Sequence, residues 1–263
     1  MKFWKEKNYK ESKKKMLVGD AFQIKQYADQ RLSIERCTGI KNKLAPLFTK
    51  EEKIVFENWP LRQIFVIGIR KKRLIACLKR LGLLTKYVTI VPSCHGETID
   101  KRTWGLSSSN TLRRGQLGCF ESHCRVWRHM IENDVQTALI LEDDAALYPN
   151  ASMCHHLMQV MHDIRQTHWD IVCLGRSFVK CLNGAPIRNW LVVSGDFYGL
   201  FAYVVSREAA IKILMLSDVQ QFSLPIDSLL SSLGISGYLK ILACEPAVCD
   251  IIANSSSDTT RII

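Results

Sequence analysis

The chain has 263 residues, of which 47% are hydrophobic, and this length is sufficient to bury a substantial core. Apolar runs stop short of the roughly 18 residues that a membrane-spanning helix needs, because charged residues interrupt them near 143, 196 and 207. These properties predict a globular chain with one main domain and argue against a transmembrane anchor.

Positive charge dominates: the net charge is +11, and the first fifteen residues hold seven Lys against two Glu. Two interpretations stay open for this opening segment, a solvated basic tail or a peripheral contact with a membrane or partner. We expect no nucleic-acid partner, because neither an aromatic RNA-binding pattern nor a recognition-helix signature accompanies the charge. A basic surface also attracts nucleotide diphosphates by long-range electrostatics.

Targeting and cysteine patterns favour the cytosol. Residues 1–7 lack the apolar stretch of a secretory signal, and residues 260–263 carry no retention signal. The ten cysteines are too widely spaced for a disulfide scaffold, and no pair has the two-residue gap of a zinc or redox motif. We therefore expect a cytoplasmic protein whose cysteines are mostly buried thiols.

The first elements follow a change of pattern at Pro60. Residues 1–60 hold no convincing strand and show loosely helical apolar spacing, so we expect a basic helical extension there. Residues 63–69 predict a short buried strand, and residues 70–83 predict a basic amphipathic helix. The β-branched run 87–91 indicates a second strand, parallel to the first after this helical crossover.

Helices and strands continue to alternate. From residue 118 apolar side chains recur every three to four residues, which predicts a helix that ends near 133. Strands are expected at 137–141 and 169–175, with a helix near 150–166 between them. This alternation predicts an α/β domain over residues 61–263, built on an open sheet that binds ligands beyond the carboxyl ends of its strands.

Three consecutive acidic residues, Glu142, Asp143 and Asp144, follow the strand predicted at 137–141. Carboxylates this close repel one another, so that one takes up a proton unless a cation neutralises them. Mn²⁺ or Mg²⁺ suits such oxygen ligands and is usually completed by substrate phosphates. Taken alone, the cluster has a second interpretation, in which it caps the strand and opens a loop.

The surrounding sequence resembles glycosyltransferase family 25, and the resemblance covers about residues 62–263. The segments that carry it are 114–127, 138–144, 169–176, 202–210, 225–230, 245–248 and 257–259. Gly175 with Arg176 and the segment 257–259 are more similar to the procollagen galactosyltransferase branch than to the bacterial lipooligosaccharide branch.

The resemblance implies a fold and a reaction. It implies a GT-A-like open mixed sheet flanked by helices that binds a nucleotide sugar. It further implies inverting transfer of a hexose, galactose or glucose, from a UDP-sugar to a hydroxyl acceptor. Collagen-like hydroxylysine and a glycan such as lipooligosaccharide are both candidates for that acceptor. Mn²⁺ or Mg²⁺ would assist the reaction.

The resemblance also assigns roles to residues. Glu142 and Asp144 would bind the metal, and Asp143 would contact the donor ribose or the metal. Asp227 is the candidate base, because burial beside an apolar segment would move its pKa into a useful range. A helix N-cap is the competing interpretation of Asp227.

Four further residues would contact the donor. Ser122 and His123 lie on the helix before the acidic strand. Two interpretations of His123 stay open, contact with the donor and structural support of the helix. Arg70 and Arg73 follow the first strand and would contact the nucleotide phosphates, although solvated surface residues are the competing interpretation.

One position departs from the family pattern. Family members usually carry Asn in the first strand where this chain has Gly68, and a missing Asn would weaken donor binding or change the base that is accepted. A catalytically inactive member that acts as a binding protein is therefore the alternative function. The acidic cluster, Asp227 and the Ser122–His123 pair argue for activity.

Overall fold

A computed structural model describes residues 59–68, 70–99, 111–147, 151–188, 191–217 and 224–252. The helical extension expected over residues 1–60 therefore lies almost entirely outside the described residues, and the segment 257–259 does too. Every helix and strand that the structure describes falls between residues 61 and 263.

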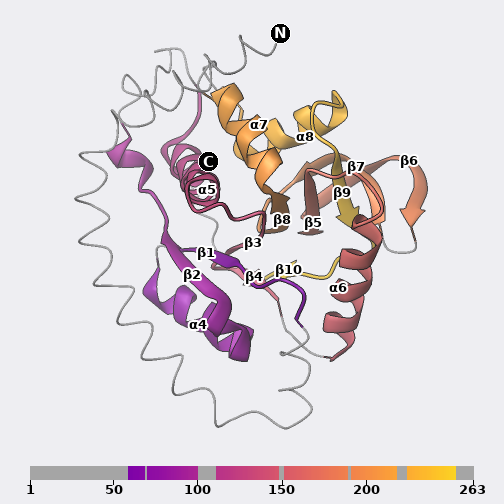
Figure 1. Cartoon of the computed structure of the whole chain (residues 1–263). Coiled ribbons are helices and arrows are strands. Elements are labelled where there is room, and N and C mark those ends of the chain that lie inside the picture. Colours follow the sequence, from indigo (N-terminus) through magenta and orange to yellow (C-terminus); the bar gives the residue numbers. More distant parts are fainter. Residues whose placement is uncertain are drawn as a thin grey trace.

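An eight-stranded mixed sheet forms the centre of the domain, in the order β2-β1-β3-β8-β5-β9-β7-β6 (Figure 1). Its strands are β1 (Ile64–Gly68), β2 (Val88–Pro92), β3 (Thr137–Glu142), β5 (Ile171–Gly175), β6 (Phe178–Arg188), β7 (Leu191–Tyr198), β8 (Ala202–Ser206) and β9 (Ile241–Cys244). Strand β1 pairs in parallel with both β2 and β3, whereas β8 runs antiparallel between β3 and β5. The carboxyl ends of β1, β2 and β3 therefore meet at one edge of the sheet.

Helices cover both faces of this sheet. They are α4 (Lys71–Leu81), α5 (Arg114–Glu132), α6 (Ala151–Ile164), α7 (Arg207–Ser217) and α8 (Ile226–Ile235). Two short 3-10 helices, η2 (Gly82–Tyr87) and η3 (Gly96–Thr98), and a small pair of strands, β4 (Ala145–Ala146) and β10 (Asp250–Ile251), complete the described elements. Helices α4 and α6 contribute to one core, and α5, α7 and α8 contribute to the other.

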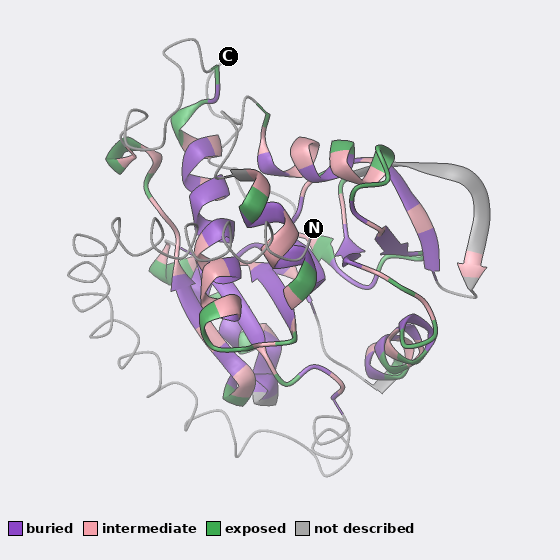
Figure 2. Ribbon diagram, turned by 45° about the horizontal axis from the view of Figure 1, so that its top comes forward, coloured by how far each residue is buried: buried purple, intermediate pink, exposed green. Residues whose placement is uncertain are grey.

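Side-chain alternation along the strands separates the two cores. In β1, Ile64 and Val66 pack with α4 and α6, whereas Phe65 and Ile67 pack with α5, α7 and α8. Successive side chains of a strand point to opposite faces, and helices cover both faces, so the strand is apolar at every position. Figure 2 shows the outcome, with buried residues along the strands and on the inward sides of the helices.

The structure confirms the expected α/β class and its mixed sheet flanked by helices. The strand at 63–69, the helix at 70–83 and the parallel second strand at 87–91 appear as β1, α4 and β2. Strands β6 to β9 and helices α7 and α8 were not predicted element by element.

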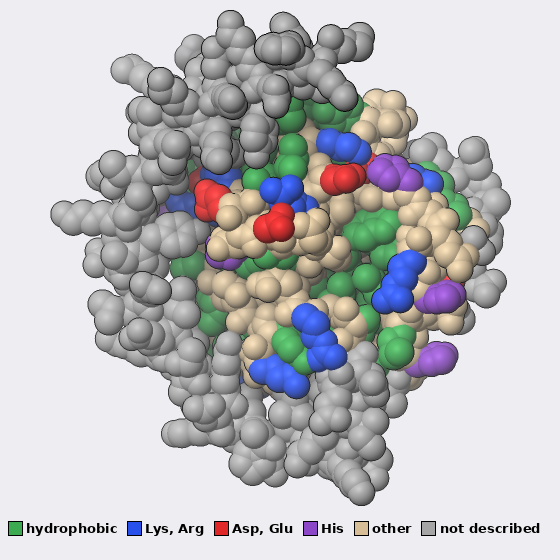
Figure 3. All heavy atoms as spheres, viewed as in Figure 1, with side chains coloured by type: hydrophobic (Ala, Val, Ile, Leu, Met, Phe, Trp, Pro, Cys, Tyr) green, Lys and Arg blue, Asp and Glu red, His purple; other side chains and the backbone are tan. Residues whose placement is uncertain are grey.

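Within the described residues, no helix combines the length and the apolar composition that crossing a bilayer would require. On the face of the molecule that Figure 3 shows, Lys and Arg side chains lie in separate groups among acidic and polar ones. The described part of this face therefore carries no continuous basic patch.

Candidate active site

A cavity of about 540 Å³ lies at the carboxyl ends of β1, β2 and β3. This is the edge at which ligands bind in open α/β sheets. Seven of the eight side chains that the sequence singled out line it: Arg70, Arg73, Ser122, His123, Glu142, Asp143 and Asp144. The eighth, Asp227, is not among the described residues that line this cavity.

Two of the three acidic side chains face an arginine. Arg73 Nη1 lies 3.5 Å from Asp144 Oδ2 and 3.8 Å from Asp143 Oδ1. The pKa of Asp143 is raised from 3.8 to about 6, mainly by burial and then by the charge of Asp144, while Arg73 lowers it. The repulsion expected from the sequence is therefore present, and a guanidinium from α4 offsets part of it.

Helix α4 also holds the backbone of the acidic turn. Arg80 Nη2 donates hydrogen bonds to the carbonyl oxygens of Asp143, at 3.2 Å, and Ala145, at 3.1 Å. Gly68 allows the turn to approach β1, since a Cβ at this position would lie 2.9 Å from both Cβ and Oδ2 of Asp143. The absence of a side chain at Gly68 and the position of Asp143 are thus linked.

Glu142 makes different contacts from its two acidic neighbours. Its Oε1 lies 3.3 Å from His123 Nε2 and 3.9 Å from Cys119 Sγ, and both of these residues belong to α5. His123 is fully buried, and its Nδ1 lies 2.8 Å from the Tyr203 hydroxyl. Burial and the nearby carboxylates raise the pKa of the Cys119 thiol well above its usual value of 9.0. The acidic cluster is therefore divided between an arginine side and a histidine–cysteine side.

Ser122 joins α5 to the loop that follows β2. Its hydroxyl donates to the carbonyl of Gly118 at 2.6 Å and accepts a hydrogen bond from the backbone N–H of Cys94 at 2.8 Å. Helix and loop touch closely here, because a Cβ at Gly118 would lie 2.4 Å from the Cys94 carbonyl oxygen. Ser122 thus shapes the cavity wall from a fully buried position.

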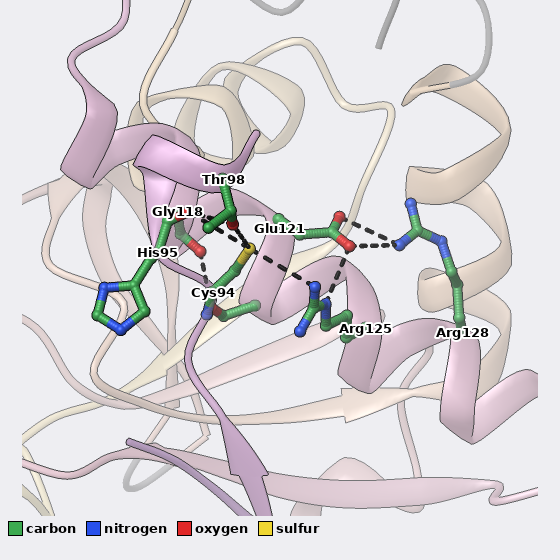
Figure 4. A network of polar contacts seen from close by, with 8 residues as sticks. Cys94, His95, Thr98, Gly118, Glu121, Arg125 and Arg128 are labelled. Atoms are coloured by element: carbon green, nitrogen blue, oxygen red, sulfur yellow. Dashed lines mark hydrogen bonds and ion pairs between the residues drawn. The ribbon is translucent and has the colours of Figure 1, made fainter. Parts of the chain in front are cut away.

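An ion-pair network supports the same loop from the side of α5 (Figure 4). Glu121 is 2% exposed and pairs with Arg125 at 3.1 Å and with Arg128 at 3.1 Å. Arg125 also lies 3.5 Å from Cys94 Sγ, and Thr98 hydrogen-bonds the carbonyl of His95 at 2.7 Å. The buried carboxylate is therefore compensated by two guanidinium groups, one of which reaches the cavity loop.

Asp227 lies in the first turn of α8, and its carboxylate accepts backbone hydrogen bonds from Gly199 at 3.0 Å and Ser228 at 2.8 Å. The helix N-cap considered from the sequence is wrong for Asp227, because Pro225 holds that position and Asp227 is the second residue of α8. Its negative charge nevertheless reaches the cavity, since it contributes to the raised pKa of Cys119. The role of Asp227 as base stays a prediction.

Sequence reasoning missed part of the cavity wall. The loop after β2 and the start of α5 contribute residues that it did not single out, among them Cys94, His95, Glu97, Arg114 and Cys119. One signal was available: Cys119 and His123 are four residues apart on a predicted helix and so share a face. No local pattern announces the loop residues.

Comparison with known proteins identifies related sequences. The family model described as glycosyltransferase family 25 (LPS biosynthesis protein) matches residues 63–230. The chain is 27% identical over 186 residues to the probable inactive glycosyltransferase 25 family member 3 of Bos taurus, covering 64% of this chain and 31% of that protein. It is 27% identical over 187 residues to procollagen galactosyltransferase 2 of Mus musculus, covering 64% and 29%.

The chain thus spans about a third of the length of these relatives. Among solved structures, A197 from STIV is similar with a TM-score of 0.38 and 13% identity, covering 72% of this chain and 83% of that one. Similarity at this level supports no functional comparison.

Proposed function

This chain belongs to glycosyltransferase family 25, and from this membership we propose that it transfers a hexose from a UDP-sugar to a hydroxyl acceptor with inversion at the anomeric carbon. The observation that carries the proposal is the cavity at the carboxyl edge of β1, β2 and β3, where carboxylates and arginines of this chain converge. A GT-A-type nucleotide-sugar site is expected at such an edge.

The anionic diphosphate of a nucleotide sugar suits the arginines in the cavity. Arg70 and Arg73 line it from the start of α4 and would bind the diphosphate oxygens by charge-assisted hydrogen bonds. Arg73 is already oriented by Asp143 and Asp144, so its side chain faces the cavity rather than bulk solvent. His123 and Ser122 would support the donor side through their buried contacts.

The acidic residues fit a hard divalent cation. Glu142 and Asp144 both line the cavity and offer the carboxylate oxygens that Mn²⁺ and Mg²⁺ prefer, with Asp143 beside them. When bound, such a cation would screen the charge that develops on the departing nucleotide diphosphate. Arg73, which pairs with Asp144 here, would turn to the phosphates if that carboxylate held a cation.

Asp227 would accept the proton of the acceptor hydroxyl. General-base catalysis of this kind contributes about 10²–10⁴ in rate. The backbone N–H groups of Gly199 and Ser228 fix the carboxylate in one orientation at the start of α8. This arrangement would suit a base that must meet an acceptor from a fixed direction.

The direct test is nucleotide release. We expect the wild-type chain with Mn²⁺ to release UDP slowly from a UDP-hexose without acceptor, and Asp144→Ala to reduce release by about 100-fold or more. Glu208→Ala removes an exposed carboxylate on α7 and should release UDP at the wild-type rate. Equal rates for Asp144→Ala and wild type would contradict the metal assignment.

Assays with two different acceptors distinguish the two substrate classes. One relative is a procollagen galactosyltransferase, and the family description names lipopolysaccharide biosynthesis. Hydroxylysine-bearing collagen peptide and a lipooligosaccharide core should therefore be compared, each with UDP-galactose and UDP-glucose. Faster UDP release with one acceptor identifies the class.

An inactive binding protein is the second candidate, since another relative is described as probably inactive. The ion pairs of Arg73 with Asp143 and Asp144 favour it, because they offset part of the repulsion between the two carboxylates without a metal. That candidate predicts UDP binding by calorimetry with no UDP release from any UDP-hexose, with or without acceptor.

A further inference from the structure

Three potential metal ligands of different chemistry meet on the floor of the cavity. Cys119 Sγ, His123 Nε2 and a carboxylate oxygen of Glu142 all lie within 4.8 Å of one another. Cys119 and His123 are one helical turn apart on α5, and Glu142 is the last residue of β3. Among the described residues, this is the one group of three His, Cys, Asp or Glu side chains with such spacing.

The separations fit one tetrahedral ion. Zinc binds sulfur at about 2.3 Å and nitrogen or oxygen at about 2.0–2.2 Å, so ligands on the same ion are about 3.3–3.6 Å apart. His123 Nε2 lies 3.3 Å from Glu142 Oε1, and Cys119 Sγ lies 3.9 Å from the same oxygen. All three ligand atoms lie within 4.8 Å of one another, so side-chain movements of about 1 Å would bring them onto one ion.

The imidazole also has the outer partner that metal-binding histidines require. Tyr203 is fully buried, and its hydroxyl lies 2.8 Å from His123 Nδ1. A hydroxyl can donate or accept, so it matches either tautomer. When the hydroxyl accepts a hydrogen bond from the Nδ1–H group, the Nε2 lone pair is available to a cation, and the ring is held toward Glu142.

From this arrangement we propose that Cys119, His123 and Glu142 bind a zinc ion whose fourth position opens into the cavity. A thiolate and an imidazole select Zn²⁺ and related transition metals, whereas Mg²⁺ and Mn²⁺ prefer oxygen ligands. Three protein ligands with one open position are typical of zinc sites that also bind water or substrate. On binding, the Cys119 thiol loses its proton to solvent, and no oxidation or reduction takes place.

This site differs from the acidic metal site of the proposed function. It needs no nucleotide, and it uses Glu142 Oε1, which faces His123 and Cys119 on α5. Glu142 belongs to both sets, so Asp144→Ala is the variant that separates them.

Cobalt provides the test, because a thiolate bound to Co²⁺ gives a near-ultraviolet charge-transfer band and tetrahedral Co²⁺ absorbs strongly in the visible. We expect both signals when CoCl₂ is added to the reduced full chain. Zn²⁺ should abolish them, and excess Mg²⁺ should leave them intact. Absence of a thiolate band in the wild-type chain would overturn the proposal.

Matched cysteine variants locate the sulfur. Cys119→Ser should lose the charge-transfer band and bind Zn²⁺ more than about 100-fold more weakly. Cys94→Ser changes another thiol of the same cavity and should keep both the band and the wild-type affinity for Zn²⁺. A band that survives Cys119→Ser overturns the site. His123→Gln and Glu142→Gln supply independent ligand losses, and circular dichroism of each variant without metal verifies that it folds.

Two further variants complete the design. Tyr203→Phe removes the outer partner and should weaken Zn²⁺ binding about tenfold while the cobalt spectrum keeps its shape. Asp144→Ala should retain the band although it loses UDP release. If Asp144→Ala abolishes the band, the cation belongs to the acidic cluster and the proposal is overturned.

Discussion

Asp143 carries the clearest electrostatic signature in the cavity, because burial and Asp144 raise its pKa from 3.8 to about 6. Between these two values the folded chain binds a proton that the unfolded chain has released, so this group's contribution to stability is present at low pH and lost as the pH rises through 6. Ionised Asp143 therefore destabilises the fold at neutral pH unless a cation joins Arg73 beside it.

Asp143→Asn removes this cost. At pH 8 in the presence of a chelator, we expect the variant to be more stable than wild type by on the order of 1–2 kcal/mol, which is less than the full shift would give because the group is partly solvated. The difference should vanish near pH 4. Urea unfolding at pH 4, 6 and 8 measures it, with Glu208→Gln as an exposed control. A difference that does not change with pH would refute the assignment.

Gly68, where the family resemblance led us to expect Asn, packs against Asp143. Gly68→Ala would place a Cβ 2.9 Å from Asp143 Cβ and Oδ2. We expect a loss of about 1–3 kcal/mol of stability from this overpacking and a weaker affinity for UDP, since Asp143 must move. Thermal unfolding and calorimetry with UDP measure the two effects. If neither the thermal stability nor the affinity for UDP changes, the acidic turn can move away from residue 68 without cost, and the prediction is wrong.

At the scale of elements, the hydroxyl of Ser122 joins α5 to the loop after β2. Ser122→Ala leaves the backbone N–H of Cys94 without its acceptor, and a lost buried acceptor costs about 1–3 kcal/mol. We expect that decrease in urea unfolding. Ser236→Ala is the control, because its exposed hydroxyl only bonds the carbonyl of Leu233 at the end of α8. Equal stability of the two variants would contradict the role of Ser122.

Elements with one strong local pattern were predictable. The apolar run at 63–69 became β1, and the three-to-four-residue apolar spacing from 118 lies within α5. Strand β8 was harder, because it is antiparallel between two parallel strands and is followed directly by α7. The direction of a strand depends on its neighbours in the sheet, which local periodicity does not report.

The candidate site was predictable where a motif and a strand end coincide. Glu142, Asp143 and Asp144 follow a buried strand, so their place at the cavity could be anticipated. Their pairing could not, since Arg73 and His123 reach them across 71 and 19 residues of sequence. Such separations are set by the crossover helix α4 and the packing of α5, and neither is encoded in the acidic motif itself.

At the scale of the whole molecule, the charge is unevenly distributed along the chain. Residues 1–57 hold fourteen Lys and Arg against eight Asp and Glu, and the first fifteen residues alone contribute five of the eleven net charges. The buried core of the described residues begins at Trp59, and the family model begins to match at residue 63. The segment with the highest density of positive charge therefore lies outside the residues that the family model matches.

This separation leads to a prediction for the full chain. Replacing Lys13, Lys14 and Lys15 by Glu changes the charge of the opening segment by −6, and each basic residue near an anionic membrane contributes about 1 kcal/mol of attraction. We expect binding to phosphatidylserine vesicles to fall by more than tenfold at low salt and UDP release to stay at the wild-type rate. Sedimentation with anionic and neutral vesicles measures binding, and the neutral vesicles serve as control. If wild type and variant bind the anionic vesicles equally, the basic segment is a solvated tail, because a membrane contact based on charge must weaken when that charge is reversed.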